Sequence, residues 1–124
     1  MRKLSWCLLL SACGGGLERA SYMTDAITYA AGARVELRLV NVSARDLRVD
    51  LCISQLVKED GAGADLPGDE DCPLEQVQLA PGEEARTLKT LPSDTPAGRY
   101  RYEATIVLPI GAGERVFTQP FTVE

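Results

Sequence analysis

Apolar and polar residues alternate along most of the chain after residue 24. The clearest run spans residues 99–108, and the residues on its apolar face are Tyr100, Tyr102, Ala104, Ile106 and Leu108. Shorter runs with the same period of two cover residues 35–39 and 47–54, the latter with Leu47, Val49, Leu51 and Ile53 on one side. A period of two is typical of β-strands with one buried face, so these three segments are predicted strands.

Turn-forming residues separate these runs at short intervals. They lie at residues 41–46, 80–82, 92–98 and 111–113, and they leave room for further short strands at 76–79, 84–91 and 116–123. Pro120 interrupts the last of these, so we expect a bulge or a partly exposed edge there. No segment after residue 23 shows helical periodicity. The pattern predicts an all-β domain, an immunoglobulin-like β-sandwich of about seven antiparallel strands.

The first thirteen residues have a different character. Two cationic residues, Arg2 and Lys3, precede an apolar stretch that ends in Leu10-Ser11-Ala12-Cys13. This is the layout of an export signal, and the stretch is shorter than the roughly 20 residues that a membrane-spanning helix needs. The alternatives are an ordinary secretory signal and an apolar start that arose by chance.

The Leu10–Cys13 segment resembles the lipobox of bacterial lipoproteins. This resemblance implies cleavage before Cys13 and attachment of fatty chains such as palmitate to its sulfur. Two or more chains hold a protein stably on a membrane. The expected organisation is a signal peptide at 1–12, a lipidated flexible tether at 13–23, and the sandwich at 24–124. The expected location is the bacterial cell envelope, at the outer membrane or on its periplasmic or extracellular face.

The cysteines agree with an exported protein. Cys7 leaves with the signal and Cys13 carries the lipid, so Cys52 and Cys72 remain as a pair in an oxidising compartment. A disulfide between them is expected to join the strand near residue 52 to the following loop, because Cys52 has the opposite parity to the apolar Leu51 and Ile53. Two reduced thiols, or half of a metal site, are the alternatives.

The charge of the mature chain is negative, with 11 basic against 18 acidic residues. Nucleic acid is therefore disfavoured as a partner. Much of the acidity crowds into residues 59–75, where the weak candidates for calcium ligands are Asp60, Asp65, Asp69 and Asp71. A solvated acidic loop is the commoner explanation for such a run, and no cofactor is expected.

The chain has no histidine, which removes histidine-activated nucleophiles and imidazole metal sites. Only Lys58 and Lys89 remain as lysines after cleavage, and both fall in polar sequence, so lysine chemistry is not indicated. No phosphate-binding glycine motif is present. The protein is therefore not expected to be an enzyme.

The segments Leu79–Glu84, Leu91-Pro92 and Pro96–Arg101 resemble the stretch from strand D to strand F of bacterial immunoglobulin-like domains. In those domains a Pro-Gly turn precedes strand E, and a Pro-x-Gly-x-Tyr segment enters strand F. The resemblance implies the fold and no activity. Tyr100 or Tyr102 is then a candidate for a tyrosine corner, whose hydroxyl bonds to the backbone near the turn before the strand.

These observations together favour a non-catalytic envelope lipoprotein. Its domain is expected to bind or organise a protein or glycan partner through loops or an exposed strand edge. A peptidase inhibitor of the same fold is the alternative.

Overall fold

The computed structural model describes residues 19–59, 76–109, 111 and 113–124. These residues form ten strands and one short 3-10 turn, η1. The elements are β1 (Ala20–Thr24), β2 (Thr28–Tyr29), β3 (Arg34–Asn41), β4 (Leu47–Val49), η1 (Leu51–Ile53), β5 (Gln55–Lys58), β6 (Val77–Leu79), β7 (Glu84–Thr90), β8 (Gly98–Val107), β9 (Gly113–Phe117) and β10 (Phe121–Val123).

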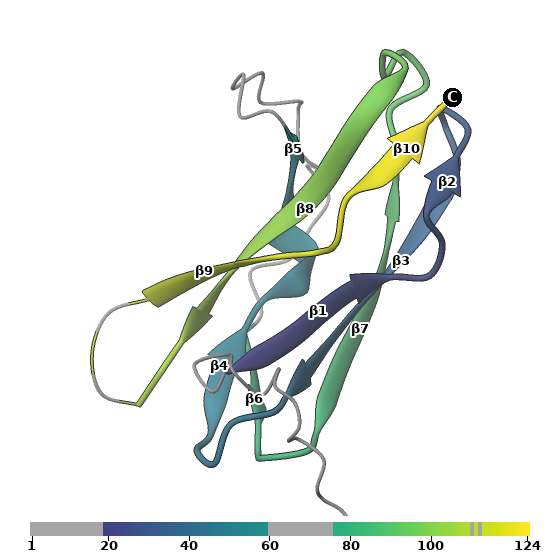
Figure 1. Ribbon diagram of the computed structural model, residues 1–124. Coiled ribbons are helices and arrows are strands. Elements are labelled where there is room, and N and C mark those ends of the chain that lie inside the picture. Colours follow the sequence, from purple (N-terminus) through teal and green to yellow (C-terminus); the bar gives the residue numbers. More distant parts are fainter. Residues whose placement is uncertain (1–18, 60–75, 110, 112) are drawn as a thin grey trace, which may run out of the picture.

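The strands form two sheets that pack as layers (Figure 1). The smaller sheet has the order β1-β3-β7, and the larger has the order β2-β10-β8-β4-β6, with β5 and β9 also paired to β8. The long strand β8 therefore lies at the centre of the larger sheet. All pairs are antiparallel except β2 with β10, which is parallel. The predicted all-β sandwich is confirmed.

The strand predicted over residues 47–54 is broken in the middle. Val49 pairs with Ile106 and Gln55 with Glu103, so five residues of one strand stand opposite two residues of β8. The extra residues form η1, where the Asp50 carboxylate accepts from the Cys52 backbone N–H at 3.1 Å. The prediction that Ile53 shares a buried face is wrong: its side chain is exposed, because the 3-10 turn has left the plane of the sheet.

The strand predicted over residues 116–123 is also interrupted, at the expected place. β9 ends at Phe117, β10 begins at Phe121, and Pro120 lies between them. Thr118 bridges the break: its backbone N–H donates to the Tyr102 carbonyl at 2.9 Å, and its Oγ1 accepts from the Tyr102 N–H at 3.0 Å. The side chain thus supplies an acceptor to β8 where the strand pairing stops.

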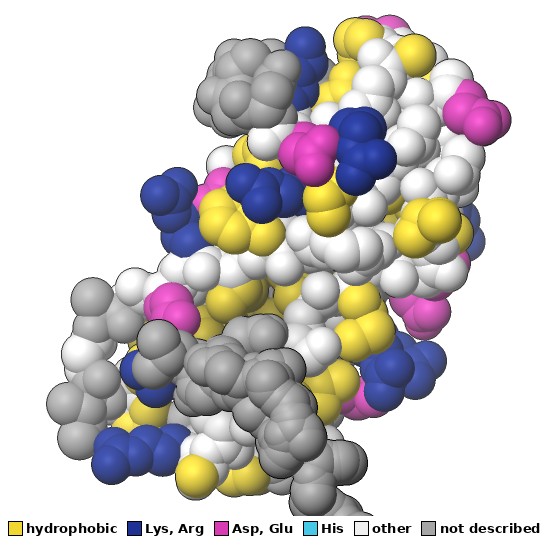
Figure 2. Space-filling view, in the orientation of Figure 1, with side chains coloured by type: hydrophobic (Ala, Val, Ile, Leu, Met, Phe, Trp, Pro, Cys, Tyr) yellow, Lys and Arg dark blue, Asp and Glu magenta, His cyan; other side chains and the backbone are white. Residues whose placement is uncertain are grey.

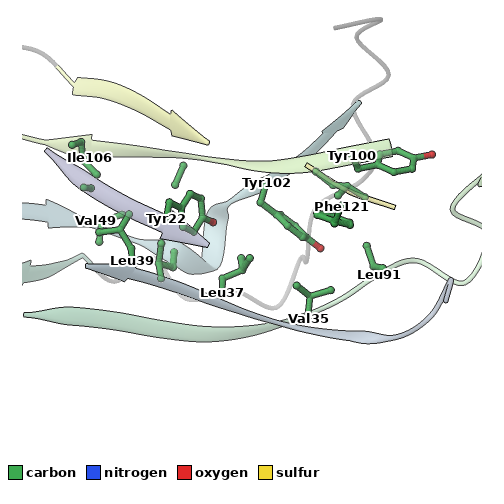
Figure 3. Packing of buried hydrophobic residues seen from close by; sticks show 14 of the residues in the cluster. Tyr22, Val35, Leu37, Leu39, Val49, Leu91, Tyr100, Tyr102, Ile106 and Phe121 are labelled. Carbon is green, nitrogen blue, oxygen red and sulfur yellow. The ribbon is translucent and has the colours of Figure 1, made fainter. Parts of the chain in front are cut away.

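The core lies between the two layers (Figure 3). Val35, Leu37 and Leu39 of β3 face the apolar side of β8, as the alternation predicts. The Phe121 ring packs edge-on against the Tyr29 ring, with centroids 5.4 Å apart. Aromatic and aliphatic side chains from both sheets therefore form one contiguous core.

A polar contact also crosses the core. The buried Tyr22 hydroxyl of β1 shares a hydrogen bond of 2.6 Å with Ser54 Oγ, just after η1. Burial raises the pKa of Tyr22 well above its usual range, so the hydroxyl stays protonated. This bond ties the smaller sheet to the break in the larger one.

The tyrosine corner is present and uses Tyr100. Its hydroxyl donates to the Pro96 carbonyl at 2.8 Å, four residues earlier in the chain. The ring is buried, while the bond closes the turn that leads into β8. The prediction from the Pro96–Arg101 segment is confirmed for this residue.

The sandwich begins before the predicted boundary at residue 24. β1 runs from Ala20 to Thr24 along β3, and Ala20 and Tyr22 are buried. Only two apolar positions alternate in this short strand, too few to separate it from the preceding tether by pattern alone.

Candidate functional site

β7 lies at the edge of the smaller sheet. It has seven residues, and among the described residues it pairs with β3 alone. Asn41 N–H donates to the Glu83 carbonyl, and Leu91 N–H donates to the Ala33 carbonyl. These two bonds show which residue pairs of the antiparallel β3–β7 ladder are hydrogen-bonded. The backbone groups of the intervening alternate residues therefore point away from β3. Those residues are Glu84, Arg86, Leu88 and Thr90.

A groove adjoins this edge, with residues of β6 and β7 in its lining. Its volume is about 440 Å³. One wall comes from the larger sheet and η1, and the other from β7. The apolar lining residues are Val49, Leu51, Val77, Leu79 and Ala85, and the others are Asp50, Cys52, Glu84, Arg86 and Thr87. Val77 is exposed at the lip. The groove thus offers some apolar side chains beside a row of outward backbone donors and acceptors that pair with no described strand.

A tight turn places β6 and β7 on either side of the groove. Glu83 N–H donates to the Ala80 carbonyl at 2.9 Å, and Gly82 has a φ of 87°. A turn with proline and then glycine at its centre suits this geometry, since only glycine adopts the left-handed region without cost. The buried Asn41 side chain donates to the Leu79 carbonyl at 2.9 Å and fixes the end of β6.

The outer face of β7 is a network of ion pairs. The Glu84 carboxylate binds Arg38 at 2.8 Å and Arg86 at 2.5 Å, and Arg86 also reaches Glu36 at 3.6 Å. The hydrogen bonds from Arg86 and Arg38 lower the pKa of Glu84. The same bond with Glu84 raises the pKa of Arg86. These ion pairs link β3 and β7 outside the core.

Lys89 departs from its predicted polar environment. It points inward from β7, is 5% exposed, and donates from Nζ to the Cys52 carbonyl of η1 at 2.6 Å. An inward-facing charge on an edge strand is one of the features that limit indiscriminate edge-to-edge pairing. The pattern around Lys89 predicts a polar environment, and only the tertiary fold brings η1 against its side chain.

Most of the predicted site residues lie outside the described residues: Cys13, Cys72, Asp60, Asp65, Asp69 and Asp71. Cys52 lies in η1, and no cysteine in the described part of the chain is free. Its pairing with Cys72 stays a prediction. Over the same residues, no three His, Cys, Asp or Glu side chains gather as a metal site would require. Nor does this part contain a helix long and apolar enough to cross a membrane.

No family model and no curated protein matches the chain. Among solved structures it is similar to the sporulation control protein Spo0M of Bacillus subtilis, with a TM-score of 0.52 and 20% identity over 86% of this chain. The chain spans 49% of the length of that Spo0M chain. A structural genomics target, SoR45, has a TM-score of 0.52 and 12% identity, covering 83% of this chain and 81% of that one. At such identities the likeness shows a shared fold alone.

Proposed function

We propose that this protein is a non-catalytic, lipid-anchored envelope protein whose sandwich captures an extended segment of a partner polypeptide along β7. The observation that carries the proposal is the outer edge of β7, unpaired among the described residues, beside a groove whose lining is partly apolar. The resemblance of Leu10–Cys13 to a lipobox supports the anchor.

The edge and the groove are complementary to one kind of ligand. An added strand would bond to the outward N–H and C=O groups of β7, which give affinity without regard to sequence. Its alternate side chains would enter the groove against residues such as Leu79 and Ala85. We therefore expect the bound segment to carry apolar residues at every second position.

The experiment uses proline to remove one donor from this edge. The Leu88 N–H points away from β3, so Leu88→Pro leaves the β3–β7 pairing intact. A photo-crosslinking amino acid at the exposed Val77 lip, in cells that make the full chain, captures the occupant of the groove. We expect Leu88→Pro to reduce the crosslinked product about ten-fold or more, because the ring also blocks the approaching strand.

The matched control is Leu88→Thr, which removes the exposed apolar side chain and keeps the N–H. It should crosslink nearly as the parent does. Hydrogen exchange on the purified complex then tests the mode of binding: the amides of Arg86 and Leu88 should gain protection. A recurrent partner that leaves these amides unprotected would contradict strand addition. Slowed turnover of papain-like or subtilisin-like enzymes without such protection would favour the inhibitor alternative.

A further inference from the structure

An arginine stacked on an aromatic ring occupies the middle of the larger sheet's outer face. The Arg101 guanidinium carbon lies 4.3 Å from the centroid of the Phe117 ring. On one side of β8, Phe117 of β9 pairs with Glu103. On the other side of β8, Val57 of β5 pairs with Arg101. Phe117 is 39% exposed. Figure 2 shows Lys and Arg side chains with hydrophobic side chains between them where β5 and β8 lie.

Arg101 has no counter-ion among the described residues, although carboxylates are near. Glu59 is bound to Arg99 at 2.8 Å, and Glu103 is bound to Arg115 at 3.0 Å. The Nε of Arg101 is buried with no hydrogen-bond partner. A buried donor without an acceptor is unfavourable and rare in folded proteins. Because this Nε is buried, a ligand would reach the guanidinium through its other two nitrogens.

We infer that Arg101, Phe117 and Val57 form a binding site for an acidic side chain of a partner polypeptide, separate from the β7 edge. Stacking on the ring holds the planar guanidinium in place, and a guanidinium presents paired N–H donors that match a carboxylate. The ligand carboxylate supplies the counter-ion that the neighbouring glutamates do not.

The surroundings of Arg101 favour a polypeptide over an acidic sugar. Val57 and Phe117 are apolar and flank the cation, so a ligand that presents a carboxylate between apolar groups buries both kinds of surface. A glutamate or aspartate between aliphatic residues has this arrangement. A uronic acid surrounds its carboxylate with hydroxyl groups, and one face of the Phe117 ring is already occupied by the guanidinium.

The test is an NMR titration of the isotope-labelled full chain with the peptide N-acetyl-Leu-Glu-Leu-amide. We expect saturable shifts at Arg101 Nε and at the Phe117 ring, and binding about ten-fold weaker for the Leu-Gln-Leu peptide. Arg101→Gln should weaken binding of the Glu peptide by a similar factor. Arg48→Gln is the matched control, since Arg48 is an exposed arginine of the same sheet that pairs with Val107 at the far end of β8, and it should change the affinity by less than about two-fold.

Three results would overturn the inference: no saturable shift, equal binding of the Glu and Gln peptides, or equal loss with Arg101→Gln and Arg48→Gln. Tighter binding of galacturonate than of the Glu peptide would replace the polypeptide by an acidic sugar. Leu88→Pro on β7 should leave this titration unchanged, so the strand-addition proposal and this one fail separately. The dispersed amide spectrum of each variant shows that it is folded.

Discussion

Single hydroxyl groups stabilise this sandwich at places where the chain bends. Tyr100 closes the turn before β8 through its bond to the Pro96 carbonyl, and Tyr22 joins the two sheets through Ser54. Tyr29 acts in the same way near the start of the domain, where its hydroxyl donates to Asp25. Burial, together with this bond, raises the pKa of Tyr29 to about 12. Each of these tyrosines packs its ring in the core and makes a hydrogen bond with its hydroxyl group.

Replacing Tyr100 by phenylalanine tests the clamp while the ring stays in the core. Tyr100→Phe removes the bond to Pro96, and we expect it to lower the free energy of unfolding by about 1 kcal/mol, as for a typical hydrogen bond. Urea unfolding followed by fluorescence or circular dichroism measures the change. Thr105→Val, at an exposed position of β8, should cost much less. Equal losses for the two variants would mean that the corner has no specific role.

At the scale of elements, two breaks shape the larger sheet. η1 interrupts the strand opposite one side of β8, and the segment around Pro120 interrupts the strand opposite the other. In each break a polar side chain takes over a hydrogen bond from the backbone: Asp50 at η1, and Thr118 between β9 and β10. The Thr118 bond goes to the central strand β8, whereas the Asp50 bond stabilises the η1 turn itself.

Thr118→Val tests this compensation, because valine has nearly the same shape and lacks the acceptor. The buried Tyr102 N–H would lose its partner, so we expect a loss of about 1–3 kcal/mol in the free energy of unfolding. Thr118→Ser keeps the hydroxyl and should retain most of the stability in the same chemical unfolding experiment. If the valine variant is as stable as the serine variant, the side-chain bond contributes little.

At the scale of the whole molecule, the excess of acidic residues lies outside the described part of the sandwich. The described residues contain 11 basic and 11 acidic side chains, whereas the whole chain has 18 acidic ones. The remaining acidic residues are Glu18 and six residues within 60–75. The acidity of the chain therefore does not describe the surface of the sandwich, and an unpaired arginine on the larger sheet is compatible with a negative protein.

The proposed lipid anchor belongs to this scale as well, because it decides where the whole protein resides. Cys13→Ser removes the sulfur that would carry the fatty chains, so the protein should move from the membrane fraction to the soluble fraction. Fractionation of cells followed by immunoblotting measures this, and mass spectrometry of the parent protein should show the added acyl mass. Cys7→Ser is the control, and it should not change the fractionation. An unchanged distribution for Cys13→Ser would exclude the anchor.

The sequence alone determined the fold class and much of the core. The alternation over 99–108 predicts the buried face of β8, and the Pro96–Arg101 segment predicts the tyrosine corner. These features are local: side chains two residues apart in a strand share a face, and a turn is specified by the residues within it.

Only the tertiary structure decided the surroundings of Lys89, Ile53 and Arg101. Lys89 lies in polar sequence and is buried because η1 packs over it, while Ile53 continues an apolar pattern and is exposed because the strand breaks before it. Among the described residues Arg101 has no counter-ion, because Glu59 and Glu103 bind other arginines across the sheet. Each outcome depends on contacts between segments far apart in the chain, and a periodic pattern carries no information about which segments will meet.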